Sequence, residues 1–121
     1  VVLKMAHGLA LALTHIHERG LVHGDVYAHN VLHDGKGGVR LGDFGAATLL
    51  PLETSKLSRQ LQAFDVRALG CLLQELNARC SDLPGGINAV HQACDGCLLE
   101  DPLARPRAHE VAALLARAIA A

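Results

Sequence analysis

The chain has 121 residues, of which 50% are hydrophobic, 19% charged and 2% aromatic, and its formal net charge at pH 7 is -1. This balance leaves no excess of positive charge for a nucleic-acid backbone, and no apolar run approaches the roughly 20 residues that a membrane-spanning helix requires. Because the sequence shows no secretory signal and begins with Val1 rather than Met, we expect a cytoplasmic protein that is part of a longer chain.

Leu and Ala together make up 41 of the 121 residues, so we expect one domain built mainly from helices that pack through aliphatic side chains. Helical spacing of apolar residues predicts a first helix over 1–19. Short apolar pairs around a glycine-rich turn then predict a loop and a two-stranded hairpin over 21–45. After a short segment over 46–60, helical spacing returns and predicts helices over 64–79, 87–99 and 106–120.

The most informative stretch runs from His23-Gly-Asp25 through Asn30, across the hairpin, to Asp43-Phe-Gly45. An H-x-D-x-x-x-x-N loop followed by D-F-G combines the base and the metal site of phosphoryl transfer. We expect Asp25 to face an acceptor hydroxyl and to take its proton. Asn30 and Asp43 offer the amide and carboxylate oxygens that Mg²⁺ prefers, and with Gly45 they are expected to bind the metal and ATP.

Nearly the whole chain resembles the C-terminal, large lobe of the eukaryotic-like protein kinase family. Residues 13–23 look like the end of the helix that leads into the catalytic loop. Residues 64–70 look like the start of the central buried helix, and 101–106 look like the closing D-P-x-x-R-P motif. The resemblance implies a mainly α fold with a small β-hairpin, which is the α+β kinase fold without its N-terminal lobe.

The resemblance also implies roles for supporting residues. Asp65 is expected to hydrogen-bond the backbone of the catalytic loop. His23 is placed in the catalytic set and is expected to bridge the backbones of the loop and of the D-F-G segment rather than to transfer a proton. Arg105 is expected to form an ion pair with Glu53, because Pro51-Leu-Glu53 is the nearest match to the A-P-E motif of the family.

The sequence departs from the family pattern at several positions. Gly24 replaces the Arg that precedes the catalytic Asp, and the step from Gly45 to Glu53 is much shorter than usual, so we expect no switching by phosphorylation of an activation loop. Tyr27 and His29 match neither acceptor class, although we expect a serine or threonine of an unknown protein substrate. The sequence has no G-x-G-x-x-G loop and no strand lysine, so we expect little activity from it alone.

Other functions remain open at this point. A pseudokinase would keep the fold as a binding or scaffold module. An aminoglycoside or choline phosphotransferase would share the H-G-D motif, but that family lacks the D-F-G and D-P-x-x-R-P motifs. The H-G-D-x-Y-A-H-N motif is also similar to that of bacterial proteins in which a kinase lobe follows leucine-rich repeats. We expect the full-length protein to contain the missing lobe upstream, and such repeats are a further possibility there.

The cysteines and histidines give no separate metal site. Cys94 and Cys97 have zinc-knuckle spacing but no matching second pair of ligands, so we expect reduced thiols in the core. His15 and His17 lie two positions apart on a helix, whereas a metal pair needs i,i+4 spacing. We expect these two side chains to point in different directions, with His15 at the surface and His17 facing the loop.

Overall fold

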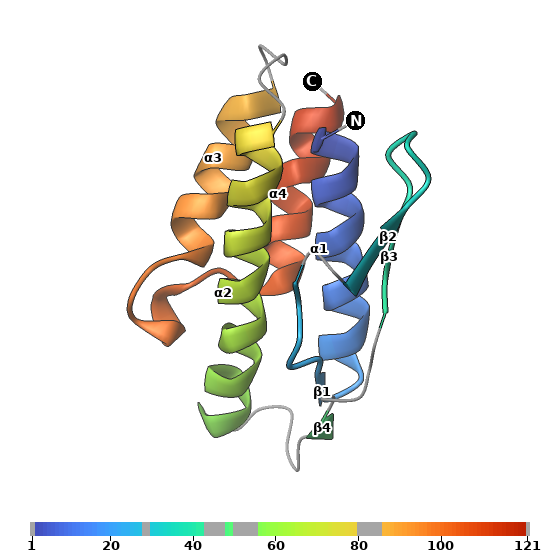
Figure 1. Ribbon diagram of the computed structural model, residues 1–121. Helices are drawn as coiled ribbons and strands as arrows, with labels where there is room; N and C mark the ends of the chain where they lie inside the picture. Colours follow the sequence, from blue (N-terminus) through green and yellow to red (C-terminus); the bar gives the residue numbers. More distant parts are fainter. Residues whose placement is uncertain (1, 28–29, 43–47, 50–55, 80–85, 121) are drawn as a thin grey trace.

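Figure 1 shows a computed structural model of the chain, which describes residues 2–27, 30–42, 48–49, 56–79 and 86–120. The elements follow one another as α1 (Val2–Glu18), β1 (Leu21–Val22), β2 (Val31–His33), β3 (Val39–Leu41), β4 (Thr48–Leu49), α2 (Lys56–Arg79), α3 (Gly86–Cys97), η3 (Pro102–Ala104) and α4 (Ala108–Ala120). This mainly helical architecture with small antiparallel strand pairs confirms the predicted fold class.

The four α-helices run alternately down and up and form a bundle (Figure 1). Helix α1 packs against α4, and α2 packs against α3, so the first and last helices of the chain are neighbours. One apolar stripe of each helix points inward, as the i, i+3, i+4 spacing requires. The core is correspondingly built from Leu, Val and Ala, with Leu9, Leu13, Leu69, Leu73, Val111 and Leu115 among its fully buried side chains.

Two short strand pairs border α1. In the hairpin, β2 pairs antiparallel with β3, with Val31 opposite Leu41 and His33 opposite Val39, and β3 packs on α1. The turn is closed by Asp34, whose Oδ1 accepts hydrogen bonds from the N–H groups of Lys36 and Gly38. These backbone donors lower the pKa of the Asp34 carboxyl below its usual value. Both strands of the hairpin lie inside the predicted range 21–45.

The structure differs from the sequence prediction between the hairpin and the second helix. Helix α2 begins at Lys56 rather than at Phe64, and β4 pairs with β1, so the segment predicted over 46–60 is partly strand and partly helix. Hydrophobic periodicity does not predict the first turns of α2, because the residues that point inward there are polar. Ser58 is 1% exposed and Gln62 is 6% exposed, and neither residue counts toward an apolar stripe.

Buried thiols lie where the last turns of α3 meet the core. Cys94 is 5% exposed and Cys97 is inaccessible to solvent. Burial, with the nearby Asp95, raises the pKa of the Cys94 thiol to about 11, and burial raises that of Cys97 to about 12. Both side chains lie in the apolar core and behave there as small apolar groups. Across the described ranges there is also no cluster of three metal-ligating side chains.

None of the helices that the structure describes is both long enough and apolar enough to cross a bilayer.

Gly70 allows α2 and α3 to approach closely. A Cβ atom at this position would lie 2.7 Å from the Cβ of Cys97 and 3.1 Å from the Cγ of Leu98. Real Cβ atoms do not approach that closely, so the absence of a side chain sets the spacing between these two helices.

We predict that Gly70→Ala destabilises the chain. Alanine improves helix propensity by about 1 kcal/mol, but overpacking costs about 1–3 kcal/mol. The steric cost should exceed the gain, because both clashing Cβ atoms are fixed to their backbones and cannot rotate away. Thermal unfolding monitored by circular dichroism should show a lower melting temperature. The control is Gln74→Ala, an exposed position on the same helix that should change little. Equal stability of the two variants would contradict the prediction.

Candidate active site

The loop between β1 and β2 carries the predicted catalytic residues and is anchored at its start and in its middle. At its start, Leu21 pairs with Leu49 and Val22 with Thr48. In its middle, Val26 is 2% exposed and belongs to the hydrophobic core. The loop therefore rests on the bundle through a buried side chain, which fixes the polar residues on either side of Val26.

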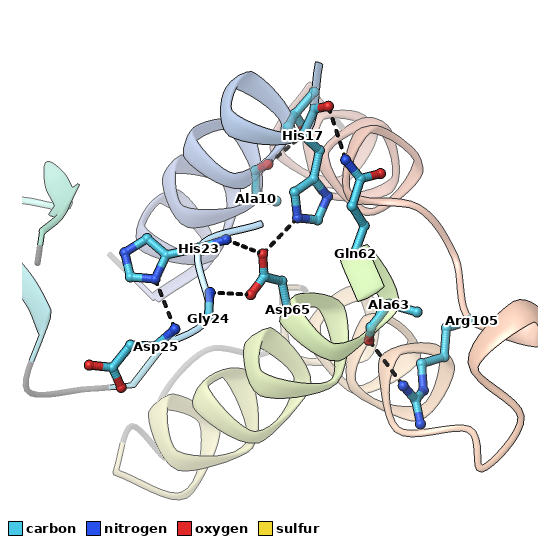
Figure 2. A network of polar contacts seen from close by, with 10 residues as sticks. Ala10, His17, His23, Gly24, Asp25, Gln62, Ala63, Asp65 and Arg105 are labelled. Carbon is cyan, nitrogen blue, oxygen red and sulfur yellow. Dashed lines mark hydrogen bonds and ion pairs between the residues drawn. The ribbon is translucent and has the colours of Figure 1, made fainter. Parts of the chain in front are cut away.

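The Asp65 carboxylate holds the start of this loop. Asp65 lies on α2 and is 2% exposed. Its Oδ2 accepts the N–H of His23 at 2.7 Å, and its Oδ1 accepts the N–H of Gly24 at 2.9 Å (Figure 2). Two backbone donors aimed at one carboxylate fix the path of the chain immediately before Asp25.

Gly24 has the backbone conformation that this contact needs. Its φ of 84° lies in the left-handed region, which a side chain disfavours. Glycine adopts this angle without strain and turns its N–H toward Asp65. Gly24, at the position where the family carries an Arg, therefore suits the backbone conformation of this turn.

His23 connects the loop to the end of the hairpin. Its Nδ1 accepts the N–H of Asp25 at 3.0 Å, so the ring proton is on Nε2, which donates to the carbonyl oxygen of Gly42 at 2.8 Å. The Gly42 N–H in turn donates to the Asn30 carbonyl at 2.8 Å. With both ring nitrogens engaged and the side chain inaccessible to solvent, the geometry suits the bridging role and not proton transfer.

Asp25 and Asn30 face each other across the loop. The Asn30 Nδ2 donates to the Asp25 carbonyl oxygen and to its Oδ2, each at 2.8 Å. Asn30 is 8% exposed, whereas Asp25 is half-buried. Both of these bonds are made by the amide nitrogen. The amide oxygen of Asn30 makes no hydrogen bond to the described residues, and it is the atom through which an amide binds a cation.

His17 joins the Asp65 cluster from α1, a contact that the sequence analysis did not identify. Its Nε2 lies 2.9 Å from Asp65 Oδ2, and its carbonyl oxygen accepts the Gln62 side chain at 3.1 Å. Helical spacing places His17 on the same face of α1 as Ala6, Ala10 and Leu13, but it does not identify Asp65 as the partner. His15 instead lies at the surface, with Arg19 beside it.

Arg105 hydrogen-bonds the backbone of α2 two residues before Asp65. Its guanidinium donates to the carbonyl oxygens of Ala63 on α2, at 3.0 Å, and of Leu99 and Glu100, at 2.7 and 3.3 Å. The side chain thus ties α2 to the segment before η3. Glu53, the predicted partner of Arg105, lies outside the described residues, so this ion pair stays a prediction. Asp43, Gly45 and His29 also lie outside them.

We predict that Asp65→Asn destabilises the chain by about 1–3 kcal/mol. Three donors converge on this carboxylate, from His17, His23 and Gly24, and the amide NH₂ of asparagine would have to face at least one of them. Chemical denaturation should show the lower free energy of unfolding. As a control, Asp95→Asn on α3 changes the same charge at an exposed position and should stay within about 0.5 kcal/mol of the wild type. Equal effects of the two substitutions would refute a special role of Asp65.

Known protein families and proteins match this chain in sequence over α1, the loop, the hairpin and the start of α2. The model of the family described as "Protein kinase domain" matches residues 1–64, which is more than half of the chain. The serine/threonine-protein kinase US3 homolog of Gallid herpesvirus 2 is 44% identical over 55 residues, or 46% of this chain and 14% of its own length.

Human serine/threonine-protein kinase Nek2 is 35% identical over 99 residues, which cover 64% of this chain and 22% of that protein. A probable LRR receptor-like serine/threonine-protein kinase of Arabidopsis thaliana, IRK, is 36% identical over 73 residues, or 60% of this chain and 7% of the relative. The chain thus spans less than a quarter of the length of these curated relatives. The family match, taken with the catalytic loop and its support by α2, shows that the chain belongs to the protein kinase family.

Proposed function

We propose that the full-length protein transfers the γ-phosphoryl group of ATP, in the presence of Mg²⁺, to a serine or threonine hydroxyl of a protein substrate. The observation that carries the proposal is the Asp25–Asn30 contact, in which one amide nitrogen holds both the carboxylate and the carbonyl of Asp25. A base and a metal ligand are thereby fixed against each other, as phosphoryl transfer by a protein kinase requires.

Asp25 is proposed to orient the acceptor hydroxyl and to receive its proton. Asn30 and His23 restrain this residue from two sides, through the carboxylate and through the backbone N–H. Asp25 is only half-buried, so the hydroxyl of a protein substrate can approach it from the solvent side. Asp65 and His23 both hydrogen-bond the backbone of the loop, so we assign them as positioning residues rather than catalytic ones.

Asn30 and Asp43 are proposed to hold Mg²⁺. The Asn30 side chain fits this role because an amide binds a cation through its oxygen, and the two hydrogen bonds of its nitrogen hold the side chain in place. Asp43 follows Gly42 directly in the sequence, and Gly42 is bonded to both Asn30 and His23. When bound, Mg²⁺ neutralises charge on the ATP phosphates, and Gly45 of the same D-F-G motif is proposed to contact the nucleotide.

The names of the relatives support the acceptor class, since the herpesvirus, human and Arabidopsis proteins are each called serine/threonine-protein kinases. We also propose that the 121 residues alone transfer little phosphate. Their sequence contains neither a G-x-G-x-x-G loop nor a strand lysine to grip the nucleotide phosphates. Those parts would come from the rest of the full-length protein.

In the full-length protein, Asp25→Asn should lower the rate of phosphate transfer by about 10²–10⁴-fold, because it removes the base. The stabilisation of the protein by Mg²⁺ and ATP in a thermal shift assay should persist in this variant. Asp43→Asn should abolish both the transfer and the metal-dependent shift. The rate is measured with γ-labelled ATP and a mixture of protein substrates, and Asp95→Asn is the matched surface control.

Three outcomes would contradict the proposal. Equal transfer by the wild type and Asp43→Asn would remove the metal role of that residue. No metal-dependent thermal shift in the wild type would indicate a scaffold module without nucleotide binding. Phosphorylation of an aminoglycoside or amino alcohol, with all protein substrates inert, would indicate a small-molecule phosphotransferase.

A further inference from the structure

Gln62 lies on the buried face of α2, one helical turn before Asp65, and is only 6% exposed. Its side chain reaches the end of α1 (Figure 2), where its Nε2 donates to the His17 carbonyl oxygen at 3.1 Å. The bond joins residues 45 positions apart in the sequence. A long polar side chain is rarely buried without a specific partner, so this contact accounts for a glutamine in the interior of the molecule.

The His17 carbonyl lies where α1 ends. The last carbonyl oxygens of a helix lack partners within the helix. The His17 oxygen receives two donors, the N–H of Gly20 at 3.0 Å and the amide of Gln62, which together occupy both of its lone pairs. Gly20 has a φ of 73°, the left-handed conformation that commonly ends a helix. Gln62 therefore helps to fix the turn at which the chain leaves α1 and enters β1.

The catalytic loop follows shortly after this turn. Strand β1 comes first, and the N–H groups of His23 and Gly24 behind it are held by Asp65. His17 takes part in both contacts, because its carbonyl binds Gln62 while its ring binds Asp65 at 2.9 Å. The two α2 side chains are three positions apart and share one face of the helix. One turn of α2 thus holds both ends of the segment that connects α1 to the loop.

We propose that Gln62 is a positioning residue for the catalytic loop. Asp65 Oδ2 accepts both the His17 ring and the N–H of His23, so a shift of the last turn of α1 displaces one of these two donors. Without the amide of Gln62, the His17 carbonyl would retain only the Gly20 N–H among the described donors at the end of α1. The role rests on the proposed function, since it concerns the placement of the loop for phosphoryl transfer.

The structural part of the proposal is tested on the chain without metal or nucleotide, so this test does not depend on kinase activity. Gln62→Met keeps the length of the side chain but removes the amide donor. NMR spectra of this variant should show shifted signals for the His17 ring and for the N–H groups of Gly24 and Asp25. Gln74→Met, at an exposed position on the same helix, is the matched control and should leave these signals unchanged.

In the full-length protein, Gln62→Met should lower kcat by about tenfold while the KM for ATP stays within about twofold of the wild type. A displaced loop impairs the transfer step, whereas the phosphate-binding groups expected in the rest of the full-length protein still hold ATP. Gln74→Met should change neither constant. The rates are measured well below the melting temperature of each variant, so that a loss of folded protein does not contribute.

The proposal is overturned if Gln62→Met leaves the Gly24 and Asp25 signals in place. It is also overturned if the wild type transfers phosphate and Gln62→Met has the same kcat as Gln74→Met. If the wild type transfers no phosphate, the proposed kinase function fails and the NMR comparison alone decides the role of Gln62. Gln62→Ala removes the donor without adding any atom, and it replaces Gln62→Met in both experiments if that variant does not fold.

Discussion

The position of the catalytic loop depends on a single buried carboxylate. Removing Asp65 from water carries a large desolvation cost, and the fold offsets it by directing three donors at the two oxygens. These donors come from α1 and from the loop, whereas the carboxylate comes from α2. One side chain thus fixes two helices and the loop relative to each other, and the positions of Asp25 and Asn30 follow from it.

The aliphatic bundle gives this polar cluster a rigid base. Val26 inserts into the same core as the helix stripes, so the loop is held by an apolar contact on one side and by Asp65 on the other. Arg105 extends the arrangement, because it binds the α2 backbone at Ala63, near Asp65 in the sequence. Side chains held by packed helices in this way keep their geometry better than side chains on free loops.

The sequence predicts the apolar half of this structure well and the polar half unevenly. Aliphatic periodicity finds all four helices, because each helix buries one stripe of Leu, Val and Ala. It misses the first turns of α2, where Ser58 and Gln62 occupy the buried face. Polar core positions escape any rule based on hydrophobicity, since their burial depends on partners distant in sequence, such as the His17 carbonyl that receives Gln62.

In the candidate site, too, the sequence predicts some features and not others. The spacing of His23, Asp25 and Asn30 predicts the loop, because these residues lie close together in the sequence and match the family pattern. The contact of His17 with Asp65 joins residues 48 positions apart in the chain, and no local pattern encodes that distance.

Gly24 has a consequence for the way in which the loop opens. Glycine has more conformational freedom in an unfolded chain than any other residue, so this turn has little intrinsic preference for its native shape. Its order comes from the bond to Asp65 and hence from the bundle. Hydrogen exchange of the loop amides should therefore follow the opening of α2 and α1, which makes the catalytic loop part of the helical cooperative unit despite its irregular backbone.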